Sequence, residues 1–213
     1  MSVRKVHLDT DLGGDIDDLC ALAMLLNWPD AEVVGVTTVV EDRGRRAGYT
    51  RYALRLAGRE DIPVAAGADG AHHPFRSPVG FPEEADFWPE PITPAPNPLQ
   101  DALALLRRNI ENGATVVAIG PYTNLALLDR ESPGLLQQAP VYVMGGHVRP
   151  VRPGFPRWDH TVDWNVQEDV SSARHVFELL DPTAIPLAVT VETALRRASL
   201  PALDASGPLA QLL

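Results

Sequence analysis

The sequence predicts an α/β fold in which an open, mainly parallel sheet carries helices on both faces. Short apolar segments rich in β-branched residues alternate along the chain with longer segments whose apolar residues have helical spacing. The strand segments are almost continuously apolar, which is typical of strands covered on both faces. Such alternation produces parallel strands joined by helical crossovers.

The first half of the chain contains three expected strands. Residues 3–8 and 32–40 predict strands, the second because it is β-branched and apolar throughout. Between them, residues 18–27 predict a helix that stops before Pro29, since a residue that precedes proline disfavours the helical conformation. The next elements are an expected helix at 44–56 and an expected short strand at 62–66.

A proline-rich stretch, residues 72–98, separates the two halves and is expected to be a long functional loop. The helix after it has a capped start: Asn97 is in the cap position, Pro98 is the first helical residue, and Gln100 is the return partner of a capping box. The remaining expected elements are strands at 114–119, 140–144 and 184–190, and helices from 123, over 168–180 and from 200. No repeat or linker interrupts this order, so we expect a single domain over residues 1–213.

Composition and charge narrow the class of protein. Of the 213 residues, 45% are apolar and 22% are charged, as in a soluble globular domain. The formal net charge of −10 is opposite to the basic surplus of nucleic-acid-binding proteins, so no nucleic-acid partner is expected. The chain has no apolar run of the roughly 20 residues that cross a bilayer. It also has no secretory signal and a single cysteine, Cys20. We therefore expect a cytoplasmic protein without a membrane partner.

An acidic segment follows the first expected strand. It contains Asp9, Asp11, Asp15, Asp17 and Asp18. Ligands of open α/β sheets bind at the carboxyl ends of the strands, and carboxylates that converge there raise one another's pKa. A divalent cation removes this repulsion, and an all-oxygen set of ligands favours calcium or magnesium. Aspartates also favour helix N-termini and solvated turns, which accounts for Asp15 as a surface residue but not for the whole segment.

Other proteins with similar acidic strings fit less well. A calcium loop of the EF-hand type that starts at Asp9 would need a glutamate where Cys20 stands. Phosphatases of the haloacid-dehalogenase type place an Asp-x-Asp after their first strand, which Asp9 and Asp11 satisfy. They normally also need a later lysine, and this chain has none after Lys5. No glycine-rich phosphate loop of the GxxxxGK or GxGxxG kind is present.

The segment DTDLGGDIDDLCAL, residues 9–22, resembles the opening motif of the inosine–uridine-preferring nucleoside hydrolases. Five further segments match motifs of that family in the same order: Gly35–Val39, Ile62–Gly67, Ala118–Ala126, Val143–Gly146 and Asp163–Ala173. The resemblance implies a nucleoside-hydrolase-like fold with a Rossmann-like strand order.

The resemblance also implies an activity, which is hydrolysis of the N-glycosidic bond of ribonucleosides to free base and ribose in nucleoside salvage. Asp11 would be the catalytic residue, activating a calcium-bound water, and would also bind the calcium ion. Asp18 and the backbone carbonyl of Thr123 would be further metal ligands, with Asp9 supporting them. A small-molecule ribonucleoside and a homo-oligomeric partner are implied as well. The implied substrate-binding residues are Asp17, Asp42, Met144, Asp163 and Asn165.

Complete members of the family carry a late His-Asp pair that residues 1–213 do not contain. We therefore expect a chain truncated at its C-terminus, either a fragment or a short relative that is a non-catalytic or weakly active, calcium-dependent ribosyl-binding protein. In a fragment, the apolar residues 209–213 would lack a packing partner. His147 and His160 are candidates to replace the missing proton donor, and Trp158 and Trp164 are candidates to stack on the base.

Overall fold

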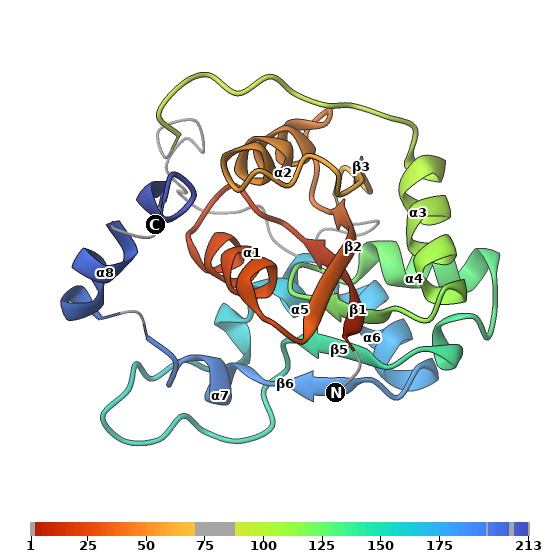
Figure 1. The fold of residues 1–213 in the computed structure, drawn as a ribbon. Helices are drawn as coiled ribbons and strands as arrows, with labels where there is room; N and C mark the ends of the chain where they lie inside the picture. The colour runs from red at the N-terminus through yellow and green to blue at the C-terminus, as the bar shows by residue number, and fades with distance from the viewer. Residues whose placement is uncertain (1–2, 71–87, 195, 205–206, 213) are drawn as a thin grey trace.

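The computed structural model describes residues 3–70, 88–194, 196–204 and 207–212, and its framework is a six-stranded parallel sheet (Figure 1). The strands have the order β3-β2-β1-β4-β5-β6. They are β1 (Arg4–Thr10), β2 (Ala31–Thr38), β3 (Val64–Ala66), β4 (Thr115–Ala118), β5 (Val141–Met144) and β6 (Thr183–Ile185). The expected α/β class with a parallel sheet is confirmed.

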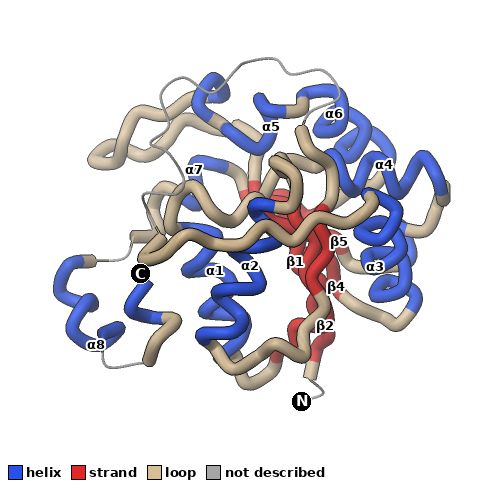
Figure 2. The backbone as a smooth tube through the Cα atoms, turned by 90° about the horizontal axis from the view of Figure 1, so that it is seen from above, coloured by secondary structure: helices blue, strands red, loops and turns tan. Residues whose placement is uncertain are grey.

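Helices cover both faces of this sheet. Helices α1 and α2 pack on one face, and α3 and α4 pack on the other, where α6 lies against α4 (Figure 2). The helices are α1 (Asp17–Asn27), α2 (Arg45–Leu56), α3 (Leu99–Glu111), α4 (Thr123–Glu131), α5 (Trp164–Glu168), α6 (Val170–Leu179), α7 (Leu187–Thr190) and α8 (Leu200–Asp204). Among the described residues, no helix has both the length and the apolar character of a membrane span.

Strand β1 lies in the middle of the sheet and organises it. It pairs in parallel with β2 and β4, and Asp9 of β1 lies opposite Thr37 of β2 and Ala118 of β4. The strand order reverses between β1 and β4, because the chain builds the sheet outward in one direction through β2 and β3 and then in the other through β4 to β6. Such a switch point opens a crevice at the carboxyl ends of the strands, where ligands bind in folds of this kind.

Two apolar clusters form the core, one on each face of the sheet. Successive residues of a strand point to opposite faces, so Val116 and Ala118 join the cluster under α3, α4 and α6. Val117 and Ile119 pack toward the cluster under α1 and α2 instead. This alternation explains why the strand sequences are apolar without interruption, as expected for strands covered on both sides.

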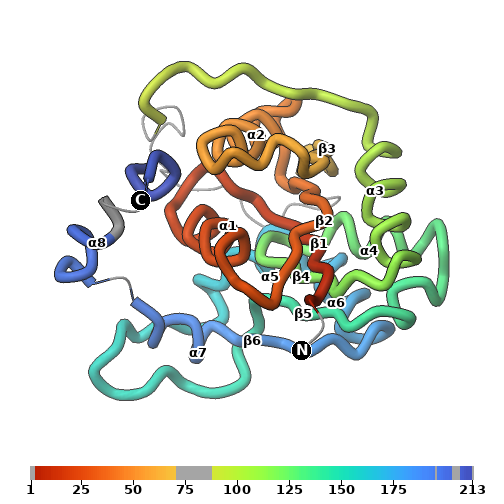
Figure 3. The backbone as a smooth tube through the Cα atoms, viewed as in Figure 1, coloured from red at the N-terminus to blue at the C-terminus, as the bar shows by residue number. Residues whose placement is uncertain are grey.

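The C-terminal segment packs on the face of the sheet that carries α1 and α2 (Figure 3). Leu209 is 7% exposed and belongs to the apolar cluster of that face, and Leu212 packs against the cluster. The expectation that residues 209–213 lack a packing partner is therefore wrong for these two leucines.

Two predicted elements have different limits from those expected. The strand expected at 184–190 ends at Ile185, and helix α7 follows it because Pro186 occupies the helix N-cap and has no N–H for strand pairing. The helix expected at 168–180 is divided at Asp169, whose backbone is not helical and whose side chain accepts a hydrogen bond from the Ser172 N–H at the start of α6.

The capping box predicted for α3 is wrong. Helix α3 begins at Leu99, its N-cap is Pro98, and no side chain caps it. The amide of Asn97 instead pairs with the backbone of edge strand β3: its Oδ1 accepts from the Ala66 N–H at 2.7 Å, and its Nδ2 donates to the Ala66 carbonyl at 2.9 Å. Gln100 donates to Glu131. Among the described residues no strand pairs with β3 on this side, and the Asn97 side chain satisfies its backbone groups.

We expect the substitution Asn97→Asp to separate these two roles. Aspartate caps a helix as well as asparagine does, but it cannot donate to the Ala66 carbonyl, and it would place a charge beside that oxygen. The variant should lose about 1–3 kcal/mol of unfolding free energy, measured by chemical denaturation. Gln100→Ala is the control and should change stability by no more than about 0.5 kcal/mol. An Asn97→Asp variant as stable as the wild type would restore the cap assignment.

Candidate functional site

The loop between β1 and α1 holds the aspartates in a fixed turn. Gly13 has a φ of 139°, and a Cβ atom there would lie 2.4 Å from the ring of Tyr49, so only glycine fits. The ring of Trp88 stacks on Tyr49 with centroids 4.4 Å apart, and its Nε1 donates to the Gly13 carbonyl at 3.2 Å. The turn that carries the acidic residues is therefore packed from outside by two aromatic rings.

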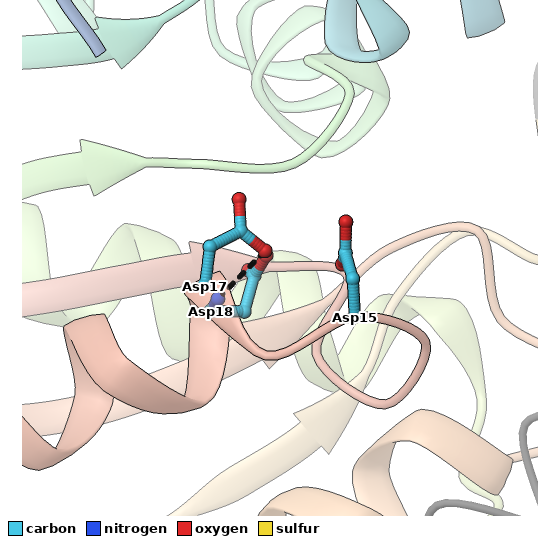
Figure 4. Close-up of side chains that lie close together, drawn as sticks. All are labelled: Asp15, Asp17 and Asp18. Atoms are coloured by element: carbon cyan, nitrogen blue, oxygen red, sulfur yellow. Dashed lines mark hydrogen bonds between the residues drawn. The ribbon is translucent and has the colours of Figure 1, made fainter. Parts of the chain in front are cut away.

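Three of the aspartates come together at the end of this loop (Figure 4). Asp15 lies on the loop, and Asp17 and Asp18 begin helix α1; one carboxylate oxygen from each lies within 4.8 Å of the others. The Asp17 carboxylate also accepts a hydrogen bond from the Asp18 N–H at 3.0 Å. Asp15 and Asp17 are exposed and Asp18 is buried. Asp15 is exposed, as expected for a surface residue, and it also lies at the cluster.

The electrostatics of the cluster are those of like charges held close together. Although Asp17 is exposed to solvent at its surface, partial removal of its carboxylate from water and the negative charge of Asp15 raise its pKa to about 6. Burial and then the charges of Asp11 and Asp17 raise the pKa of Asp18 well above its usual range, against a hydrogen bond that the Thr10 hydroxyl donates. In the described part of the chain, no positive charge lowers the pKa of Asp17 or Asp18. The arrangement can accept a cation.

Asp11 is half-buried beside this cluster and is held by groups from distant segments. Its Oδ2 accepts a hydrogen bond from the Trp164 indole at 2.9 Å, and its carbonyl accepts one from the guanidinium of Arg46. A Cβ atom on Gly120 would lie 2.9 Å from Asp11 Oδ1, so the backbone after β4 closes on this carboxylate. Burial raises the pKa of Asp11 to about 6, although the charge of Arg46 and the Trp164 hydrogen bond lower it.

Asp9 forms the floor of the site. It is fully buried, and its Oδ1 accepts hydrogen bonds from the Thr37 hydroxyl and from Asn124 Nδ2. Its Oδ2 has no hydrogen-bond partner among the described residues. Burial raises the pKa of Asp9 to about 7, against these two hydrogen bonds.

A directed chain of buried hydrogen bonds continues from Asp9 into the sheet. The Thr37 hydroxyl gives its single proton to Asp9, so His7 Nε2, 2.9 Å from that hydroxyl, must be the protonated ring nitrogen. His7 Nδ1 then accepts from Asn109 Nδ2 at 2.8 Å, and the same amide nitrogen donates to the Val34 carbonyl. Burial lowers the pKa of His7 to about 3, so the ring is neutral.

Thr123 begins helix α4 next to this floor. Its hydroxyl donates to Asp169 Oδ2 at 2.7 Å, and the other oxygen of Asp169 caps helix α6. Both residues are buried. The hydroxyl of Thr123 is thus engaged in joining α4 to α6.

The residues expected to line a sugar pocket meet at the end of β5. Asn165 Nδ2 donates to the Ile119 carbonyl at 2.6 Å and to the Met144 carbonyl at 3.0 Å. Tyr122 donates to the same Met144 carbonyl at 2.7 Å. These contacts join the ends of β4 and β5 and bring Asn165 and Met144 together at the edge of the sheet that carries the aspartates.

Asp163 is buried, and its carboxylate accepts hydrogen bonds from two backbone N–H groups. Its Oδ2 accepts from the Gly146 N–H at 2.6 Å, and its Oδ1 accepts from the Val166 N–H at 3.2 Å, which caps helix α5. Burial raises its pKa. The Asp163 carboxylate therefore ties the turn after β5 to the start of α5.

Asp42 is not brought to the aspartates by any contact of the described chain. Its carboxylate is 57% exposed and pairs with Arg45 at 2.8 Å. The adjacent Glu41 is buried instead, where it accepts hydrogen bonds from Thr38 and from the Arg46 and Ala47 N–H groups at the start of α2.

The sequence did not predict which side chains hold Asp9 and Asp11 in place. Trp164, considered as a base-stacking residue, donates to Asp11 across 153 positions of sequence. Arg46 and Asn124 lay within expected helices and gave no signal of their own. His147 and His160 lie with ring centroids 6.3 Å apart in the loop after β5.

Comparison with known proteins identifies relatives of this chain. A sequence model described as inosine-uridine preferring nucleoside hydrolase matches residues 6–213. The chain is 33% identical over 159 residues to Uridine nucleosidase 1 of Arabidopsis thaliana, covering 67% of this chain and 45% of that protein. It is 30% identical over 188 residues to Pyrimidine-specific ribonucleoside hydrolase RihA of Klebsiella pneumoniae, covering 81% of this chain and 56% of that protein. The chain spans about half the length of the curated relatives it matches.

Solved structures share the fold. A plant nucleoside hydrolase, the PpNRh1 enzyme, superposes with a TM-score of 0.76 at 22% identity, covering 98% of this chain and 68% of that one. The purine-preferring ribonucleoside hydrolase from Gardnerella vaginalis gives a TM-score of 0.75 at 20% identity, covering 95% and 66%. Since the family match begins in β1 and extends through the last residue, the chain belongs to the inosine-uridine preferring nucleoside hydrolase family.

Proposed function

We propose that this protein hydrolyses the N-glycosidic bond of ribonucleosides to free base and ribose in a calcium-dependent reaction. The observation that carries the proposal is the aspartate cluster between β1 and α1, at the switch point of the sheet, in a chain of this family. Asn165 and Met144 lie at the same edge of the sheet, where a sugar would sit. The substrate class is a small ribonucleoside.

The residues present fit a hard divalent cation. Their donors are all oxygens, one buried oxygen of Asp9 has no partner, and burial and mutual repulsion raise the pKa of the neighbouring carboxylates. Calcium accepts such oxygen sets in flexible geometry. The ligands in our proposal are Asp18 of the cluster, Asp11 beside the cluster, and the Thr123 carbonyl, with Asp9 supporting them. A bound calcium ion would lower the pKa of a water molecule and hold the diol of the sugar.

Asp11 is the proposed general base. Its Oδ2 is engaged by Trp164, so Oδ1 is the oxygen available to take a proton. The attacking water forms a bond to C1′ of the ribose and gives its proton to Asp11. The C1′–N bond breaks, and its electron pair goes to the base, which then takes up a proton. Positive charge develops on the sugar in such a reaction, and nearby carboxylates stabilise it.

The remaining acidic and amide side chains are proposed to hold the sugar. Asp17 presents an exposed carboxylate at the start of α1, where it can accept hydrogen bonds from the ribose hydroxyls. Asn165, Met144 and Asp163 are proposed to line the other side of the pocket. We assign no ribose contact to Asp42, because its carboxylate pairs with Arg45 at the surface.

The proposal is tested with inosine, uridine and nitrophenyl riboside, each incubated with chelator-treated protein and with protein returned to calcium. We expect calcium-dependent release of nitrophenolate, because this leaving group needs no proton donor and reports on the aspartates alone. Chromatography of the nucleoside reactions shows which free base is released. The absence of any product in the presence of calcium would contradict the proposed function.

Asp11→Asn should abolish most of the activity while preserving the shape of the side chain. General-base catalysis contributes about 10²–10⁴ in rate, so nitrophenolate release should fall by at least that factor. Asp61→Asn is the matched control, because Asp61 is exposed on the loop before β3 and pairs with Arg59. The control should keep wild-type activity. An Asp11→Asn variant within about tenfold of the wild type would show that another group activates the water.

Calcium should stabilise the protein more at about pH 8 than at about pH 5. Without metal, the folded-state pKa is about 7 for Asp9 and about 6 for Asp11 and Asp17, above the ordinary value of an aspartate. The folded protein therefore holds protons that the unfolded chain has lost, and its stability falls as pH rises from about 4 to about 7. A cation offsets the repulsion between the charged forms. Thermal unfolding with calcium and with chelator, at both pH values, measures the difference. An equal shift in melting temperature at the two pH values would contradict this account.

A further inference from the structure

Residues 12–17 join two of the proposed cation ligands, Asp11 and Asp18, so the spacing of these carboxylates depends on the path of that connection. Two glycines at positions 13 and 14 lie in it, and glycine has the greatest backbone freedom of any residue. Ile16 is the N-cap of α1, and its side chain gives the helix no capping hydrogen bond. Contacts with other segments therefore contribute to the path that the connection takes.

Helix α2 supplies two of these contacts. The guanidinium of Arg46 donates to the Asp11 carbonyl. Tyr49 is 3% exposed, and its ring lies where a Cβ atom of Gly13 would be, at 2.4 Å. Residues three positions apart share one face of a helix, so a single face of α2 supports the backbone from Asp11 to Gly13.

Trp88 contacts the same backbone from a different segment. Its ring is parallel to that of Tyr49, with an interplanar angle of 2° and centroids 4.4 Å apart, and it meets the ring of Tyr52 edge-on at 5.8 Å. These ring contacts fix the plane of the indole and therefore the direction of its N–H. The N–H donates to the Gly13 carbonyl at 3.2 Å. Trp88 thus holds the backbone between the ligands and leaves their charges unchanged.

The segment that carries Trp88 is itself attached to α2, which it passes on its way to α3 (Figure 1). The Ala95 N–H donates to the Gly44 carbonyl at 2.8 Å. A Cβ atom on Gly48 would lie 2.5 Å from the Thr93 carbonyl oxygen, so the two backbones are in close contact. Trp88 is therefore anchored through contacts that do not involve the acidic loop.

We propose that Trp88 is a positioning residue for the cation site, which it serves by holding the connection between Asp11 and Asp18 in one path. This role rests on the metal site of the proposed function. It extends that site to a side chain that acts through the Gly13 carbonyl and is not itself a ligand. Ligands that are already in position bind more tightly, because less conformational freedom is lost on binding.

Calorimetric titration of chelator-treated protein with calcium tests this role. Trp88→Phe keeps an aromatic ring beside Tyr49 and removes the donor. Its dissociation constant for calcium should rise about three- to tenfold, as expected for the loss of one hydrogen bond. Trp88→Leu also removes the stacked ring and should bind more weakly still. Trp28→Phe is the matched control, because Trp28 is 52% exposed at the opposite end of α1, and it should bind like the wild type.

Nitrophenyl riboside provides a second measurement. The calcium concentration for half-maximal nitrophenolate release should rise in Trp88→Phe by the same factor as the dissociation constant. The rate at saturating calcium should stay close to that of the wild type, because mass action returns the variant to its calcium-bound state. A residue that only supports the fold would lower the melting temperature in chelator and leave both calcium constants unchanged.

All titrations are made below the unfolding temperature of each variant, so that weak binding does not reflect a lost fold. If wild-type protein binds calcium and Trp88→Phe binds it within about twofold, the positioning role fails and the proposed function stands. If wild-type protein binds no calcium, the proposed metal site fails, and the role of Trp88 fails with it.

Discussion

The repulsion among the carboxylates at the end of β1 is the constraint on which the rest of the site depends. At an effective dielectric constant of about 20, two unit charges about 5 Å apart repel by roughly 3 kcal/mol, and contact with solvent reduces this. Asp15, Asp17 and Asp18 lie within this range of one another, with the charge of Asp11 acting on the last two. A fold that brings these groups together must hold them there without neutralising them.

The protein does so largely with neutral donors. The Asp9 carboxylate is fixed by a hydroxyl and an amide, that of Asp11 by an indole, and that of Asp18 by a hydroxyl. The guanidinium of Arg46 donates to the backbone carbonyls of Asp11 and Val40. Neutral donors set the position of a carboxylate while its charge remains. The contacts that position the carboxylates therefore leave the crevice negatively charged. This charge can stabilise a cation or a sugar that becomes positively charged.

Local sequence patterns predicted the fold. Where the structure differs from the prediction, the cause is mostly a contact between segments that are distant in sequence. Apolar alternation and the rule that ligands bind at strand ends follow from short stretches of sequence, and both placed the aspartate cluster correctly at the end of β1. Asn97 is of a residue type and at a position that predict a helix cap, but its amide pairs with the backbone of Ala66 at the edge of the sheet instead. Pro186 ends a strand because of its missing N–H, within a segment that reads as apolar throughout. The role of Trp164 at Asp11 depends on a contact between α5 and the segment after β1, 153 positions apart in sequence, which no local pattern records.

The hydrogen-bond chain below Asp9 has a consequence for how this sequence can change over time. Asn109 donates to His7, His7 donates to Thr37, and Thr37 donates to Asp9. Replacing any one by an apolar residue leaves the next with a buried group unsatisfied, at a cost of about 1–3 kcal/mol. Replacing all three by apolar residues removes the unsatisfied groups among them. Positions 7, 37 and 109 are thus coupled, and relatives should keep this trio or lose it together, while Asn124 continues to hold Asp9 in either lineage.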